Sequence, residues 1–390
     1  MNSEKFSGNC YLFFPCYYST YKKIGVSTAQ INDFTNDYLV SFTKYFSLEV
    51  NVQLHQNTQR VYLNTINILY LDGQEHQDKK TIPVDVFMTF HKKTKLSVIT
   101  LAIFNAEIPI SNLLDRISQN NIEIEFENKY ITLDTYLKNY GITKLNSGKV
   151  CLSAHTEIDD NIFPYYFANE TYNSSVMFAK LKHEKFGKNV FSNIAQYDSS
   201  DLYVGKKSIL RIDKRDYSVD KKGRIESDII FLFIMEILIF KEASLERTNQ
   251  KIVNYISNNK YISISELNKV SMEFSRTMPF WDINVFNYIT AQNLANDIQK
   301  AFLIEDKYNV YLKNQKFLQH KLNLKQSIEQ EKENSLLFYI AIILFSFEIY
   351  NVCKDFISSK PLSLSLATFI FILLLIYKSR KNKSIENVDE

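Results

Sequence analysis

The most chemically suggestive residues lie near the C-terminal end of the chain. Residues 336–352 form a 17-residue apolar stretch in which Glu348 is the only charge, and Tyr350 and Asn351 follow it. A charge within a membrane-spanning helix is costly, so such a residue usually faces protein or water rather than lipid. Rings of carboxylate and amide oxygens from several copies would attract and hold a hydrated cation. We therefore predict Glu348, Tyr350 and Asn351 as selectivity residues, with Glu348 and Asn351 as the metal contacts.

One face of this predicted helix carries residues at alternating intervals of three and four, the spacing of neighbouring helical turns. The face is polar at both ends and apolar in the middle: Asn351, Glu348, Leu344, Ala341, Leu337, Asn334, Gln330 and Ser327. Around a symmetric axis it would line a pore, and Leu337, Ala341 and Leu344 would form a dry constriction that gates by dewetting. The alternative is that Glu348 snorkels to the membrane surface, because it lies near the end of the apolar stretch.

A basic segment at residues 206–224 is the second candidate site. It contains eight basic residues in 19, partly offset by Asp213, Asp216 and Asp220. Clustered basic side chains bind phosphate-bearing ligands and anionic lipid head groups. The predicted ligand-binding residues are Lys206, Lys207, Arg211, Lys214 and Arg215. A solvated edge strand and loop is the alternative interpretation.

The sequence lacks the motifs of the common catalytic and nucleotide-binding sites. No P-loop, GxGxxG, HExxH or CxxC pair occurs, and the six histidines have no metal-ligand spacing. His155-Thr156-Glu157 has the HxE pattern of a zinc deaminase, but no PCxxC follows it. We therefore predict a protein that is not an enzyme.

A second apolar stretch, residues 361–377, contains no charge. Each stretch is just long enough to cross a bilayer, and residues 353–360 between them leave room only for a tight outer hairpin. The tail, residues 378–390, begins with four basic residues in six, whereas the hairpin has two lysines. The positive-inside rule then predicts a multi-pass protein of the inner (plasma) membrane with both termini in the cytoplasm. A buried helical hairpin in a soluble core is the alternative.

Residues 224–335 are predicted to form a helical layer and one long stalk helix. From Trp281 to Lys360 the chain has neither Gly nor Pro, so nothing breaks a helix that approaches the first span over residues 281–335. Apolar pairs recur there every seven residues, which predicts a coiled-coil seam: Leu303/Ile304, Val310/Tyr311, Phe317/Leu318 and then Leu324. A shorter apolar run at 229–240 contains Glu236 and is expected inside the helical layer, a re-entrant or surface helix being the alternative.

Residues 1–223 are predicted to form an α+β cytoplasmic body with a mixed sheet. We expect strands at 11–14, 60–71, 82–90, 96–104, 122–126, 149–153 and 208–212, and helices at 28–45, 110–118 and 133–140, the last two capped by Ser111 and Asp134. The first 20 residues do not have the pattern of a signal peptide. The four scattered cysteines are typical of reduced thiols. The net charge of +3 argues against a direct nucleic-acid partner.

This order of elements resembles the CorA family of magnesium channels, which are funnel-shaped homopentamers. The resemblance covers residues 225–383 by layout and the N-terminal body only by class. The family closes its first span with Tyr-Gly-Met-Asn, whereas this chain has Ile349-Tyr350-Asn351-Val352, with a Tyr and an Asn but no Gly-Met. By this resemblance Asn351 would contact the hydrated cation. The family's cytoplasmic basic ring would correspond to Lys378, Arg380, Lys381 and Lys383.

The resemblance implies a homo-oligomeric ion channel in the lipid bilayer, a pentamer that carries Mg²⁺ or another divalent cation and is gated by a ligand on the cytoplasmic body. Divergent members of the family are CRISPR-associated membrane effectors gated by a nucleotide second messenger, so an antiviral role is one alternative. A membrane-anchored sensor without a pore and a membrane-disrupting effector without cation selectivity are two others. Replacement of Glu348 and Asn351 distinguishes a selective pore from an anchor.

Overall fold

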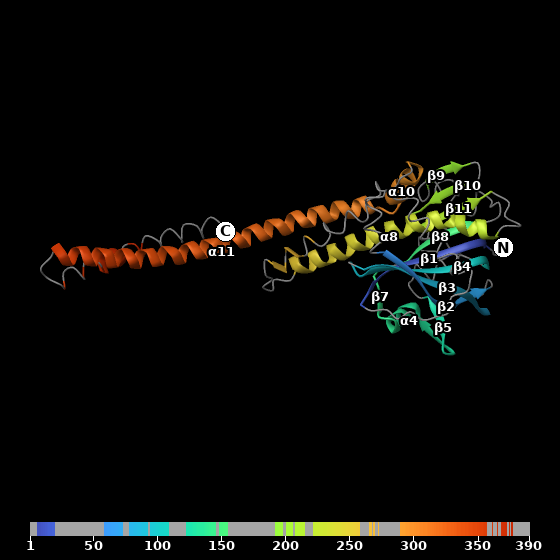
Figure 1. Cartoon of the computed structure of the whole chain (residues 1–390), viewed down its shortest axis with the longest axis horizontal. Coiled ribbons are helices and arrows are strands. Elements are labelled where there is room, and N and C mark those ends of the chain that lie inside the picture. The colour runs from blue at the N-terminus through green and yellow to red at the C-terminus, as the bar shows by residue number, and fades with distance from the viewer. Residues whose placement is uncertain are drawn as a thin grey trace, which may run out of the picture. The chain divides into compact units, whose positions relative to one another are not determined.

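In a computed structural model, the chain divides into two compact units, Met1–Tyr261 with Asn268–Gln315, and Ile262–Leu267 with Lys316–Glu390 (Figure 1). The structure describes residues 6–19, 58–72, 78–92, 94–108, 122–145, 148–154, 192–197, 200–205, 207–214, 221–257, 265–266, 268–269, 272, 289–356, 361, 365, 368–372, 374 and 376. The helices predicted at 28–45 and 110–118, and the tail 378–390, lie outside these residues.

The first unit is built on one sheet of eleven strands in the order β6-β5-β2-β3-β4-β1-β8-β11-β10-β9, with β7 paired to β1. The strands are β1 (Phe6–Tyr18), β2 (Thr58–Asp72), β3 (Asp78–His91), β4 (Leu96–Ile108), β5 (Glu123–Phe126), β6 (Lys129–Thr132), β7 (Ile142–Lys144), β8 (Lys149–Ala154), β9 (Ser192–Tyr197), β10 (Ser200–Val204) and β11 (Ser208–Asp213). Among these pairs β8 and β11 run parallel and the others antiparallel. The predicted mixed sheet is confirmed.

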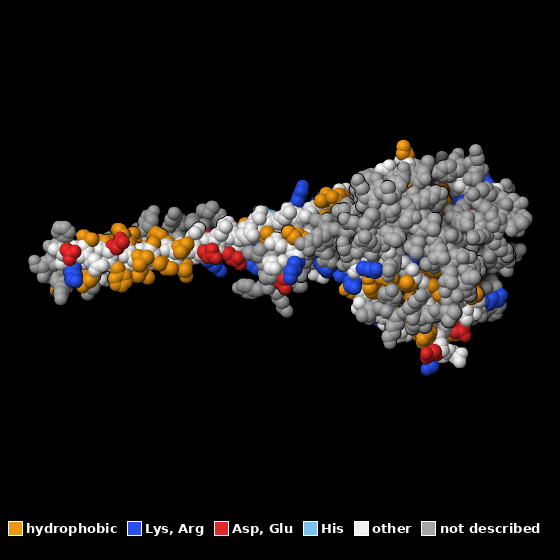
Figure 2. All heavy atoms as spheres, viewed as in Figure 1, with side chains coloured by type: hydrophobic (Ala, Val, Ile, Leu, Met, Phe, Trp, Pro, Cys, Tyr) orange, Lys and Arg blue, Asp and Glu red, His pale blue; other side chains and the backbone are white. Residues whose placement is uncertain are grey.

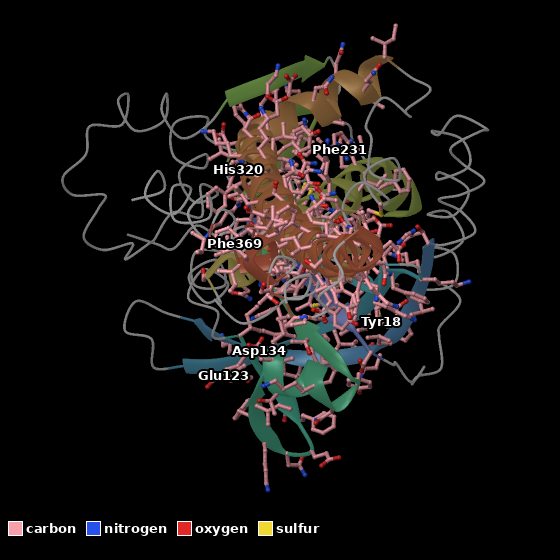
Figure 3. The ribbon with its side chains drawn as sticks, turned by 90° about the vertical axis from the view of Figure 1, so that its left-hand side faces the viewer. Tyr18, Glu123, Asp134, Phe231, His320 and Phe369 are labelled. Carbon is pink, nitrogen blue, oxygen red and sulfur yellow. The ribbon has the colours of Figure 1, made fainter. Side chains whose placement is uncertain are left out.

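The two faces of the sheet have different covers because side chains alternate along each strand. On β1, Cys10, Leu12, Phe14 and Cys16 point into an apolar core that includes Tyr136 of the short helix α4 (Leu133–Asn139). On the opposite face Asn9 and Tyr11 contact helix α8 (Lys221–Ser257). Figure 1 shows α8 and α4 on opposite sides of the strands. Figure 3 shows Phe231 of α8 well above the blue strands, and Asp134 of α4 lower down beside the green segments.

Helix α8 contains the apolar run 229–240, and the structure corrects its expected surroundings. The run packs on strands β1 and β4 of the sheet, with α10 (Ile289–Ala301) also against α8, rather than inside a purely helical layer. Glu236 within the run is fully buried because it accepts hydrogen bonds from Arg60 of β2 and, at 2.8 Å, from Thr100 of β4. A sheet of this size supplies the buried partners that the charge requires.

Most of the predicted strands fall inside observed ones, but one cap is wrong. Thr132 is the N-cap of α4: its Oγ1 accepts a hydrogen bond from the backbone N–H of Thr135 at 3.3 Å. Asp134 lies in the first turn and pairs with Lys144 at 2.6 Å. A carboxylate in the first turn still favours the helix through its dipole. Strands β6, β7, β9 and β10 were not predicted.

The long helix begins later than the absence of Gly and Pro suggests. Helix α11 spans Ile304–Phe356, and it is separated from α10 by Phe302 and Leu303. Leu303 has φ of 57°, a left-handed conformation that breaks a helix without Gly or Pro. Its neighbours Phe302 and Ile304 are both buried, 1% and 0% exposed, so apolar burial fixes this bend. The predicted unbroken helix from residue 281 is therefore wrong.

Candidate functional site

Residues 336–352 form regular helix within α11. Ser346, the one hydroxyl near the middle of this stretch, satisfies its hydrogen-bonding capacity by donating to the backbone carbonyl of Ile342 at 2.7 Å. Within the described part of the chain, this is the one helix long and apolar enough to cross a membrane, by length and composition. Only 6% of its most apolar 18-residue segment is buried, whereas the core helix of a soluble protein is mostly buried. Figure 2 shows apolar side chains gathered over this end of α11.

Five of the six predicted pore residues lie on the uncovered side of this helix. Leu337 and Leu344 are 60% and 61% exposed, and Ala341, Glu348 and Asn351 are also exposed. We call these five residues the axial stripe. At 1.5 Å per residue it extends about 21 Å along the helix, most of the thickness of a bilayer's hydrocarbon core.

The opposite side of the same helix is covered within the chain. Ile342 is only 4% exposed, and Phe338, Ser346 and Ile349 are half-buried. At 100° per residue this covered side lies about 140° around the helix from the axial stripe. The two sides of the span therefore have different environments, and the side that carries the charge is the one that a single copy leaves open.

Tyr350 does not belong to the axial stripe. It is half-buried and, two residues from Glu348, points away from it by helix geometry. Glu333, by contrast, lies one turn before Leu337, close to the same side, and is exposed. The spacing of three and four along the predicted face selects Asn334 instead of its neighbour Glu333, so sequence analysis did not indicate Glu333. With Glu333 included, the stripe has a carboxylate beyond each end of its apolar middle.

The second apolar stretch is described only in part. Pro361, Ser365, residues 368–372, Leu374 and Ile376 are helical, and the remaining residues of 357–390 lie outside the described part of the chain. A second membrane span therefore stays a prediction. The hairpin predicted at 353–360 begins too early, because residues 353–356 are the last of α11, and 357–360 lie outside the described residues. Among the described residues, no three His, Cys, Asp or Glu side chains are placed to hold a metal ion.

The predicted basic site is not brought together as one cluster. Arg211 is buried on β11, where its guanidinium donates to Asp228 of α8 and to Asp213, each at 2.8 Å, and stacks 4.9 Å above Phe231. Lys214 follows the end of β11 and pairs with Asp201 at 2.9 Å. Lys206 and Arg215 lie outside the described residues.

Asp228 is the centre of the network that buries Arg211. Its carboxylate also accepts hydrogen bonds from Asn9, Tyr11 and Ser153 at 2.9, 2.8 and 2.7 Å. Burial, together with the nearby carboxylate, raises the pKa of the Tyr11 hydroxyl well above its ordinary value. Four side chains donate to the Asp228 carboxylate, and Arg211 also donates to Asp213, so this network is a structural joint between α8 and the sheet.

Lys207 is the member of the basic segment that lines a cavity. The cavity has a volume of about 300 Å³ and also contains Lys149, Glu242, Glu246 and Lys307. Sequence reasoning missed these four residues, because they come from strand β8, helix α8 and the start of α11. Their separation in the sequence left no local pattern that could have indicated them.

Comparison with known proteins gives no family to this arrangement: no protein-family model matches the chain, and no curated protein matches it.

Proposed function

We propose that the chain is one subunit of a homo-oligomeric membrane channel that conducts cations along the axial stripe of α11 and is gated by a ligand on the sheet-containing unit. The permeant ion proposed is a divalent cation such as Mg²⁺, as the resemblance to the CorA family implies. Both termini lie in the cytoplasm in this proposal, and a second span follows the first.

The observation that carries the proposal is the exposure of Glu348 and Asn351 on the uncovered side of an apolar helix. A carboxylate and an amide that faced lipid would each be costly, so this side requires a protein or water-filled neighbour. Equivalent stripes from other copies provide that neighbour. A ring of such helices places the carboxylates around a cation path and the leucines around its narrowest part.

The decisive first measurement is the mass of the detergent-solubilised particle by native mass spectrometry. A ring of copies is expected, five by the family resemblance. A monomer or a dimer would refute the axial pore, because two helices do not enclose an ion path, and would leave a membrane anchor as the better interpretation.

Ion flux into liposomes then tests the stripe. Glu348→Gln should lower Mg²⁺ flux about tenfold, because it removes the charge that concentrates cations at the pore entrance. Glu331→Gln is the matched control, since Glu331 is exposed on the same helix but about 120° around it from the stripe. Equal flux in both variants would contradict a pore at Glu348.

A further inference from the structure

The cavity beside Lys207 lies where four elements of the first unit meet, and we call it the junction cavity. Lys149 begins β8, Lys207 precedes β11, Glu242 and Glu246 are one turn apart on α8, and Lys307 is in the first turn of α11. Phe302, between α10 and α11, forms one wall. Leu303 at its rim is 40% exposed, and Lys207 and Lys307 are half-buried, so the cavity is accessible to solvent.

The parallel pairing of β8 and β11 brings two of the lysines to the same end of the two strands, where both strands begin. Val150 is in register with Ser208, and the backbone N–H of Val150 donates to the carbonyl of Lys207 at 2.9 Å. In paired parallel strands, the residues one position before a paired couple also lie side by side. Here these residues are Lys149 and Lys207. Lys149 and Lys207 therefore enter the cavity from adjacent strands.

The charges in the junction cavity do not balance. Lys149 lies 3.1 Å from Glu242, and Lys307 pairs with both Glu242 and Glu246. With Lys207 the lining has three ammonium groups and two carboxylates. Glu242 thus serves two lysines, and one positive charge remains over the lining as a whole.

Lys149 is the most deeply buried of the three lysines, 7% exposed. Its ammonium lies 4.0 Å from the centre of the Phe302 ring. Burial lowers the pKa of Lys149 most, the Glu242 and Glu246 carboxylates oppose part of this effect, and the charge of Lys307 lowers the pKa further. Burial also acts against the charge of Lys307, but Glu242 and Glu246 outweigh it and raise the pKa of Lys307. An additional anion near Lys149 would stabilise its charged form.

We propose that the junction cavity binds a small soluble ligand that carries phosphate groups, held by Lys149, Lys207 and Lys307. Ammonium groups that converge on a partly enclosed space are a common way to bind phosphate oxygens. Phe302 offers an apolar wall to the remainder of the ligand. The role of this anion as the gating ligand rests on the proposed function. The binding site itself does not depend on that proposal.

Binding at this cavity acts directly on the start of the long helix. Lys307 anchors the first turn of α11 to α8 through Glu242 and Glu246, and Asn249 of α8 accepts a hydrogen bond from Asn314 of α11 at 3.3 Å. A phosphate between the lysines competes with these carboxylates for Lys307. The left-handed Leu303 next to it is a strained bend that such a change would release or tighten.

Titration of the full-length protein with inorganic pyrophosphate, in neutral detergent without divalent cations, tests the site by calorimetry. Lys207→Gln should weaken binding about tenfold, the effect of losing one charge-assisted hydrogen bond. The fold should be retained, because only the backbone of Lys207 takes part in the sheet. Lys214→Gln is the matched control at the far end of the same strand, outside the cavity, and should bind as the wild type does.

No binding of pyrophosphate at millimolar concentration, or equal losses in Lys207→Gln and Lys214→Gln, would overturn the site. Nanodiscs identify the source of the phosphate: binding that is retained in both zwitterionic and phosphatidylglycerol discs supports a soluble ligand. Loss of binding in the anionic discs alone would assign the cavity to a lipid head group and overturn a soluble ligand.

Flux measurements keep this proposal separate from the channel itself. Pyrophosphate that binds through Lys207 but changes no flux in a protein that conducts would overturn its gating role and leave the site. A protein that binds pyrophosphate and never conducts would instead contradict the proposed function. Conduction that responds to pyrophosphate in the wild type and not in Lys207→Gln supports both.

Discussion

Three buried cations of the sheet face three carboxylates of one helix. Arg60 pairs with Glu236, Arg211 with Asp228 and Lys149 with Glu242. Buried ion pairs add little net stability, because desolvation of both charges offsets their attraction, but a broken pair leaves a costly unpaired charge. Since each carboxylate pairs with a different cation of the sheet, the pairs fix the position of α8 along the strands.

The Arg60–Glu236 pair provides a test of this interpretation. Both side chains are 0% exposed. Glu236→Gln should destabilise the fold by about 3–5 kcal/mol, because Arg60 would remain charged and buried without its carboxylate. The double variant Arg60→Met, Glu236→Leu should recover most of this loss. Thermal unfolding of the full chain in detergent measures both, and a double variant as unstable as the single one would contradict the argument.

Gly8 lies at a position in the sheet that leaves no room for a side chain. It lies at a bulge in the pairing of β1 with β4, and a Cβ there would lie 2.1 Å from the carbonyl oxygen of Ser153 on β8. Gly8→Ala should destabilise the protein by roughly 2 kcal/mol or more, since a central strand must move. Ser7→Ala, one residue earlier in β1, is the control, and equal unfolding temperatures for the two variants would refute the close approach.

At the scale of the element, α11 buries only half of its heptad pattern. Ile304, Tyr311 and Leu318, seven residues apart, are 0–2% exposed. Their neighbours Val310, Phe317 and Leu324, also seven residues apart, are 48–50% exposed. A regularly spaced exposed apolar row is typical of a helix that packs against further helices, so the row is the expected contact between stalks of neighbouring copies.

Charge placed in this row should prevent assembly without unfolding the chain. We expect Val310→Glu with Phe317→Glu to give smaller particles by native mass spectrometry, because buried carboxylates at a helix interface lack partners. Lys316→Glu with Gln319→Glu changes the charge more and lies about 100° or more around the helix from the row, so it should leave the particle intact. An unchanged mass in the first variant would remove the row from the interface.

How much the sequence predicted depends on how local each signal is. The alternation along β2 and β3 and the turn between β3 and β4 are local, and those strands were predicted correctly. Strands β6 and β7 have four and three residues, too few for a period to show. The bend at Leu303 has no Gly or Pro because burial of its two neighbours, not chain propensity, enforces it.

The two candidate sites differ in the same way. The axial stripe belongs to one helix, so spacing alone indicated Leu337, Leu344 and Glu348 as sharing a side. Glu236 was noticed as a charge in an apolar run, but its partner Arg60 is 176 residues away and could not be assigned. The junction cavity draws on strands and helices that only the tertiary fold brings together.

On the scale of the whole molecule, α11 is shared by both compact units. Its first residues, to Gln315, belong with the sheet, and the residues from Lys316 onward belong with the apolar stretch. Helix α11 continues through this boundary without a break, from Ile304 to Phe356. Within the proposed channel, we therefore expect a change at Lys307 to be transmitted to the stripe along the backbone of this single element.

An unbroken helix also preserves angular phase. Each residue inserted after Glu331 should turn Glu348 by about 100° relative to Lys307, whereas seven residues restore the angle to within about 20°. We expect one or two inserted alanines to abolish ligand-controlled flux and seven to retain it, measured in liposomes. Flux that falls steadily with insert length would show that distance matters instead. The helix would thus transmit rotation rather than distance. Added length in whole heptads would be tolerated, and a change in the orientation of Glu348 would not.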